Sequence, residues 1–199
     1  MHSFVDHYLP AWFQNAVRSS RPLKVDFTDS RFVSVFPEQG RYVSNIVDWA
    51  EHSLLQVVGI EFNVLPDRLA EPDGRSLSQL RWTLLLQSLQ RQPHSNDFLL
   101  SRVCLASWPS LTQLPENALV MAARLCALLA RRPTTASVIP RLLGLPESQV
   151  FSMIKALSLH GHVQVSGASV TASPSEPDDE ARPVASLIGR IWQRLLPQP

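Results

Sequence analysis

The spacing of apolar residues predicts a helix and then a hairpin at the start of the chain. From Phe4 to Val17, apolar residues recur at the i, i+3, i+4 spacing of one helical face, and Pro10 suits the first turn of its better-formed part. Residues 23–28 alternate apolar and polar side chains, which is the two-residue period of a strand. Two more strand-like runs flank the turn at Gly40, so a β-hairpin is expected there.

Helical and strand periodicities continue to alternate up to residue 94. The stretch 45–56 suits a helix, 57–65 a strand, and 77–90 a second helix that Ser76 or Ser78 can cap. The element order is roughly α-β-β-β-α-β-α, which predicts a small α+β domain over residues 1–94. Three tryptophans lie in apolar patterns and are expected in the core: Trp49, Trp82 and Trp108.

Residues 95–166 have the pattern of a winged helix-turn-helix domain. The stretch 97–108 is typical of a strand, and 116–130 predicts a long helix. Another helix begins at Pro146, and the alternating residues 162–166 that follow it predict the wing strand. The buried stripe expected on the long helix consists of Ala118, Met121, Ala122, Leu125, Leu128 and Leu129.

The short helix between these two has recognisable ends. Thr134 or Thr135 can cap its start, and Gly144 after Leu143 is a natural left-handed residue at its end. Pro140 is awkward in the interior of this helix, because a proline there removes one hydrogen bond and kinks the helix.

The end of the chain combines a linker with a second apolar stripe. Residues 167–183 are rich in small and acidic side chains and contain three prolines, so they predict a flexible acidic linker. From 184 to 196, apolar residues follow the spacing of an amphipathic helix. The residues of this stripe that we expect to bind a partner are Val184, Leu187, Ile188, Ile191, Trp192 and Leu195.

Three placements are open for this C-terminal helix. It can fold back on its own domain, dock in the groove of a partner or of a second subunit, or lie on a membrane surface. Its two arginines and the acidic linker make a poor case for a membrane surface. The linker spans roughly 20 Å by random-coil scaling, so the helix can reach a partner held elsewhere.

Composition narrows the class of protein. The 199 residues have a formal net charge of +1, which predicts no general attraction to nucleic acid or acidic membranes. Cys104 and Cys126 have no CxxC spacing and are expected as buried thiols in a reducing compartment. The N-terminus has no signal-peptide pattern, and no run approaches the roughly 20 apolar residues of a membrane span. A cytoplasmic protein is therefore expected.

The sequence contains none of the common catalytic motifs: no GxxxxGK[ST], GxGxxG, HExxH or GxSxG. His160 and His162 offer two metal ligands, but a tight turn splays them and no cysteine or carboxylate cluster accompanies them. Aspartates beside strands and turns are expected as caps rather than acid pairs: Asp26, Asp29, Asp67 and Asp73. We expect a non-enzymatic protein without cofactor or metal.

The helix after Pro146 could read DNA. Its outward positions include Gln149, Ser152 and Lys155, which suit base edges or phosphates, and Arg141 precedes it near the expected backbone path. The predicted wing, however, carries no arginine or lysine, and Glu147 stands where a phosphate would approach. A winged helix used for protein docking or structural support is therefore preferred over one that binds nucleic acid.

Several stretches carry a family resemblance. They are the WPSLT connection at 108–112, the long helix after it, the LGLP turn at 143–146, and the stretches PEQGRYVS and EPDGRSLSQLRW. With these features the chain resembles a group of bacterial proteins, from GC-rich proteobacteria, that accompany Ras-like small GTPases of the gliding-motility type and their roadblock-fold partners. The resemblance implies a cytoplasmic, non-enzymatic regulator of a GTPase or of surface motility, and it supplies no catalytic residues.

The leading hypothesis is an adaptor in which an α+β domain packs on a winged helix and the tethered C-terminal helix engages a protein partner. The alternative is a transcription regulator that reads DNA, as a homodimer. A third hypothesis is a small-ligand sensor whose pocket lies at the N-terminal sheet. The three hypotheses require different surface features: an apolar protein-binding surface, an exposed DNA-reading helix or a ligand pocket.

Overall fold

The structure is a computed structural model that describes residues 4–46, 49, 56–63 and 74–167. The chain is mixed α+β, and the two sheets of the described residues are antiparallel. Most of the helix predicted over 45–56, the linker beyond Gly167 and the whole C-terminal stripe lie outside the described residues. Among the described residues, no helix is long and apolar enough to cross a membrane.

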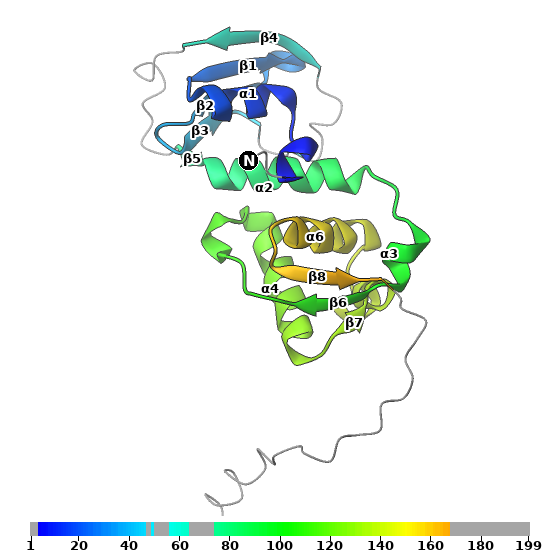
Figure 1. The fold of residues 1–199 in the computed structure, drawn as a ribbon. Helices are drawn as coiled ribbons and strands as arrows, with labels where there is room; N and C mark the ends of the chain where they lie inside the picture. The colour runs from blue at the N-terminus through cyan, green and yellow to red at the C-terminus, as the bar shows by residue number, and fades with distance from the viewer. Residues whose placement is uncertain (1–3, 47–48, 50–55, 64–73, 168–199) are drawn as a thin grey trace, which may run out of the picture. The chain divides into compact units, whose positions relative to one another are not determined.

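The first sheet has five strands in the order β4-β1-β2-β3-β5 (Figure 1). The alternation at 23–28 forms β1, and Gly40 turns the β2–β3 hairpin at a φ of 63°, so both predictions are confirmed. The strand bounds are β1 Leu23–Phe27, β2 Phe32–Phe36, β3 Arg41–Ser44, β4 Val57–Phe62 and β5 Arg75–Ser76.

Helix α1 (Ala11–Ser19) covers one face of this sheet and follows a short 3-10 helix, η1 (Phe4–Tyr8). Pro10 stands at the N-cap of α1, where its missing N–H costs no helical hydrogen bond. Trp12 is buried, and its ring meets that of Phe27 on β1 edge-on at 6.4 Å. The face of the sheet that carries Leu23, Val25 and Phe27 is therefore the core face.

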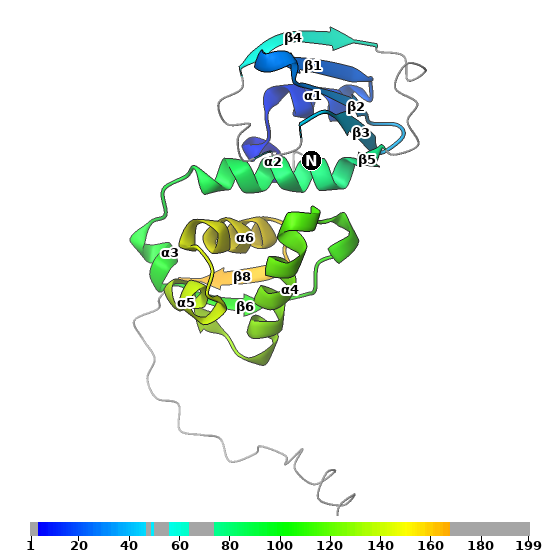
Figure 2. The same cartoon turned by 180° about the vertical axis from the view of Figure 1, so that it is seen from behind.

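Helix α2 (Leu77–Gln90) has buried apolar side chains on more than one side, because it is packed from two directions (Figure 2). It contacts β3, β5 and η1 on one side and the later helix α6 (Glu147–Leu159) on the other. Ser76 occupies its N-cap position, but the side chain accepts no capping hydrogen bond. The buried residues of α2 are Leu80, Trp82, Leu84, Leu85, Leu86 and Leu89.

The second sheet has three strands in the order β7-β6-β8. Its bounds are β6 Arg102–Leu105, β7 Thr134–Thr135 and β8 Val163–Ser166, so the strand expected at 162–166 is confirmed. The prediction of one strand over 97–108 is wrong in its first part, which forms the short helix α3 (Asn96–Leu100). Ser95 explains this, because its side chain accepts a hydrogen bond from the Phe98 N–H and caps α3.

Three helices accompany this sheet: α4 (Glu116–Arg131), α5 (Ile139–Leu143) and α6. Short 3-10 helices, η5 (Leu111–Gln113) and η6 (Ala136–Val138), precede α4 and α5. Gly144 ends α5 at a φ of 63°, as expected. The difficulty expected at Pro140 does not arise, because α5 begins one residue earlier and the proline lies in its first turn.

Nearly all of the described buried apolar residues form one cluster, which includes side chains from both sheets and from α2 and α6. Of the tryptophans expected in the core, Trp49 and Trp82 are buried, whereas Trp108 is 52% exposed and that prediction is wrong. The shared cluster means that the helix at the end of the first segment and the helices of the second segment exclude water together. The boundary expected at residue 94 stays a prediction.

Candidate functional site

Helix α6, the helix expected to read DNA, is largely enclosed. Ser152, Ala156 and His160 lie at i, i+4 and i+8 and share one face of it. His160 stacks on Trp82 of α2, with ring centroids 4.4 Å apart. This face of α6 is therefore turned toward α2, and the small Ser152 and Ala156 allow the two helices to approach closely.

The four residues expected to contact DNA do not form one exposed surface. Gln149 and Arg141 are exposed, but Ser152 is 0% exposed and its hydroxyl donates to the Gln149 carbonyl at 2.8 Å. Its placement on the outward face was wrong, because the pattern alone did not reveal that α2 covers this side. The ammonium group of Lys155 lies 5.2 Å from the centre of the Phe98 ring, and burial lowers its pKa.

The contact between α2 and α6 includes a partly buried imidazole, that of His160. Burial lowers the pKa of His160 to about 4, and the nearby positive charge of Arg81 and the neighbouring His162 add to this effect. His160 is therefore neutral near pH 7, and its Nε2 atom is buried without a hydrogen-bond partner. A neutral imidazole suits stacking on an indole ring inside a helix–helix contact.

His162 has a structural role at the start of β8. Its Nδ1 atom lies 2.9 Å from the Ser107 hydroxyl, and its carbonyl accepts hydrogen bonds from the N–H groups of Ala106 and Ser107. Among the described residues, no cluster of three or more histidine, cysteine, aspartate or glutamate side chains could hold a metal ion. The HGH stretch thus ties the loop after β6 to the start of β8.

The remaining candidate groups are separated in the structure. Asp26 pairs with Lys24 at 2.8 Å, and Asp29 adopts a φ of 62° in the turn before β2. Asp67 and Asp73 lie outside the described residues. Both cysteines were expected to be buried thiols. Cys126 is buried, and burial raises the pKa of its thiol to about 11, whereas Cys104 is only half-buried. The Cys126 thiol is therefore protonated near pH 7 and is a poor nucleophile.

Trp108 is exposed on a loop that is fixed on both sides. Ser107 before it is bound to His162, and Pro109 after it is buried. The Gln113 N–H then donates to the Ser110 carbonyl in the turn that leads to α4. A large aromatic side chain on a fixed loop is typical of a protein-binding anchor, since little entropy is lost when it is covered. Sequence reasoning missed this, because Trp108 lies in an apolar pattern that is typical of a core segment.

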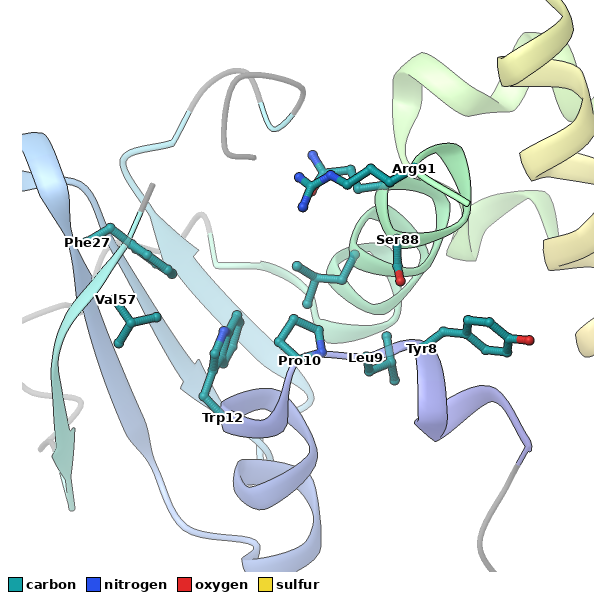
Figure 3. Close-up of a pocket in the computed structure, with 10 residues that line it drawn as sticks. Tyr8, Leu9, Pro10, Trp12, Phe27, Val57, Ser88 and Arg91 are labelled. Carbon is teal, nitrogen blue, oxygen red and sulfur yellow. The ribbon is translucent and has the colours of Figure 1, made fainter. Parts of the chain in front are cut away.

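A hollow of about 460 Å³ lies between α1, the sheet and α2 (Figure 3). Trp12 and Phe27 point toward it, and Arg91 extends over it from the end of α2. Its other lining residues are Tyr8, Leu9, Pro10, Val57, Leu84, Gln87 and Ser88. Apolar side chains share this lining with the polar groups of Gln87, Ser88 and Arg91, and the volume is within the range of small-ligand sites.

No family model, curated protein or solved structure matches this chain.

Proposed function

We propose that this chain is a non-enzymatic adaptor that binds a protein partner, and that residues 95–166 form a winged helix used for docking and support. The enclosure of α6 by α2 is the observation that carries this proposal. A reading helix must present its side chains to the major groove. Here Ser152 is buried and Lys155 lies over Phe98, so two of the four candidate contacts have other uses.

The arrangement of the second segment supports the winged-helix interpretation. The helices α4, α5 and α6 follow one another, and β8 then returns along β6, with β7 between α4 and α5 in the sequence. A left-handed Gly144 joins α5 to α6 in the position of the turn. Such a scaffold keeps its internal packing while its loops bind other molecules.

Two surfaces of the adaptor are proposed to contact the partner. The first is the fixed loop that presents Trp108. The second is the apolar stripe of residues 184–196, which lies outside the described residues and is proposed from its sequence pattern alone. The family resemblance of the sequence makes a Ras-like small GTPase, or a roadblock-fold protein that accompanies one, the first partner to test.

A binding assay with purified proteins tests this function. The full chain is immobilised, and small GTPases and roadblock proteins encoded in the same genome are added, each GTPase loaded with GTP or GDP. Replacing Ile188 and Trp192 by Asp should abolish capture and leave the circular dichroism melt unchanged. The matched control replaces Ser186 and Gln193 by Asp, which adds the same charge to the polar side of the stripe and should retain capture.

Each outcome of this assay is informative. Undiminished capture by the Ile188→Asp, Trp192→Asp variant would contradict the role of the stripe. A collapsed melt would show instead that residues 184–196 belong to the core. Capture that also survives Trp108→Ala would move the partner site away from both proposed surfaces.

DNA binding stays the alternative, because Gln149 and Arg141 are exposed at the start of α6 and on α5. A gel shift with random duplex at low salt tests it, since sequence-specific regulators keep a salt-sensitive affinity for any DNA. A shift that disappears in the Arg141→Ala, Gln149→Ala variant would favour the alternative. No shift at low salt would remove it.

A further inference from the structure

Strand β4 lies at the edge of the five-stranded sheet and carries large apolar side chains on its surface. Four of its six residues, Val57, Val58, Ile60 and Phe62, are between 47% and 70% exposed. Edge strands of monomeric proteins are usually short, charged or covered, because an open edge invites pairing with another strand. The opposite edge fits this rule, since β5 has only two residues and leads directly into α2.

The exposed side chains of β4 continue the core face of the sheet. In the β1–β4 register, Phe62 lies opposite Leu23 and Ile60 opposite Val25. The register then shifts between Asp26 and Phe27, so that Val57 lies opposite Phe27 and Val58 has no partner on β1. Paired residues of an antiparallel ladder share a face, so these three apolar residues lie on the side that α1 covers over β1. The hydrophobic face of the sheet thus extends one strand beyond the part that is buried.

The backbone of β4 also offers hydrogen-bonding groups to its open side. The Asn63 N–H donates to the Pro22 carbonyl at 2.9 Å, which places this group on the side of β1. Successive residues of an antiparallel strand point their backbone groups to alternate sides. The N–H and C=O of Phe62 and of Ile60 therefore point away from β1, toward the side of β4 on which no strand of the described residues lies.

We propose that β4 pairs in antiparallel fashion with β4 of a second copy of this chain, which joins the two five-stranded sheets into one. A two-fold axis at Ile60 lets the two Ile60 residues exchange both of their backbone hydrogen bonds. The same register places Val58 opposite Phe62 of the second copy, and Gly59 opposite Glu61. The apolar stripes of the two copies then lie side by side on one face.

The charges on β4 favour a second copy as the occupant of this edge. Glu61 is the only charged residue of the strand, and the proposed register places it opposite a glycine, so no like charges meet across the axis. Lys24, which lies opposite Glu61 on β1, provides a cation on the same face. The strand therefore pairs with itself without the edge charges that usually prevent such association.

The mass of the full chain in solution, measured by light scattering over a dilution series, tests this interface. We expect a dimer that dissociates on dilution. Ile60→Pro should raise the dissociation constant at least tenfold, because it removes the central outward N–H while the bonds to β1 remain. Val58→Lys, at the most exposed apolar residue of β4, should have the same effect without altering the monomer. Glu61→Gln is the matched control on the polar face and should leave the dimer unchanged.

A wild-type chain that stays monomeric at every concentration would overturn the proposal. So would a dimer that both the Ile60→Pro and the Val58→Lys variants retain. A dimer lost only when the chain is cut after Ser173 would assign self-association to the C-terminal segment and likewise overturn it. Partner capture by the monomeric Val58→Lys variant is measured in parallel, so that loss of the dimer and loss of the proposed adaptor function are distinguished.

Discussion

Helix α6 and the Trp108 loop differ from their sequence predictions in opposite directions: a residue expected to be exposed is buried in the helix, and one expected to be buried is exposed on the loop. The helix was expected to expose Ser152 and Lys155, yet Ser152 is buried and α2 packs along this side. The loop was expected to bury its tryptophan, yet Trp108 is 52% exposed between a hydrogen-bonded serine and a buried proline. The comparison teaches that the helix contributes to the core, while the loop offers an aromatic side chain to other molecules.

The strongest test of this comparison is a charge placed inside the contact between α6 and α2. Ser152→Asp should lower the free energy of unfolding by about 3 kcal/mol or more, because an unpaired carboxylate is costly to bury. Urea denaturation followed by circular dichroism measures the change. Gln149→Asp, one turn earlier and exposed, is the matched control and should change the stability by less than about 0.5 kcal/mol. Equal effects at both positions would mean that α2 does not cover α6.

A second test uses the pH dependence of stability at the same contact. The pKa of His160 is lowered to about 4, below its ordinary value of 6.5, so the unfolded chain binds the proton more readily between these values. The contribution of His160 to stability is fully present above about pH 6.5 and is lost as the pH falls toward 4. Thermal melts across this range should show a falling Tm.

The variant His160→Phe sharpens this test, because phenylalanine can stack on Trp82 but does not titrate. Its Tm should fall less than that of the wild type between pH 6.5 and 4, while both chains have similar Tm values at pH 7.5. An unchanged pH dependence in the variant would assign the effect to other groups. His94, whose pKa is also lowered by burial, is the first of these to examine.

The smallest effect on stability is expected at the loop. Trp108→Ala should change the free energy of unfolding by less than about 1 kcal/mol, because about half of the indole is already in water. Partner capture in the purified assay should nevertheless fall at least tenfold. Trp82→Ala is the contrasting variant, since loss of a buried tryptophan typically costs about 3–5 kcal/mol. Equal destabilisation by the two variants would place Trp108 in the core after all.

Local patterns in the sequence determined most of the secondary structure. The alternation at 23–28, the turn at Gly40, the start of α6 after Pro146 and the end of α5 at Gly144 were all predicted correctly. These features depend on side chains and φ preferences within a few residues of one another, which the sequence displays directly. The start of α3 was missed, although Ser95 before Asn96 and Asp97 is a recognisable capping signal.

Only the tertiary structure decided which faces of these elements are covered. The sequence of α6 shows small residues at 152 and 156, and both an open surface and a close helix–helix contact are compatible with them. The sequence predicted a strand at 57–65, but only the structure shows that β4 lies at the edge of the sheet with its apolar side chains exposed. Burial depends on residues far apart in the chain, such as Trp82 against His160, and hydrophobic periodicity gives the period of a stripe without identifying what packs on it.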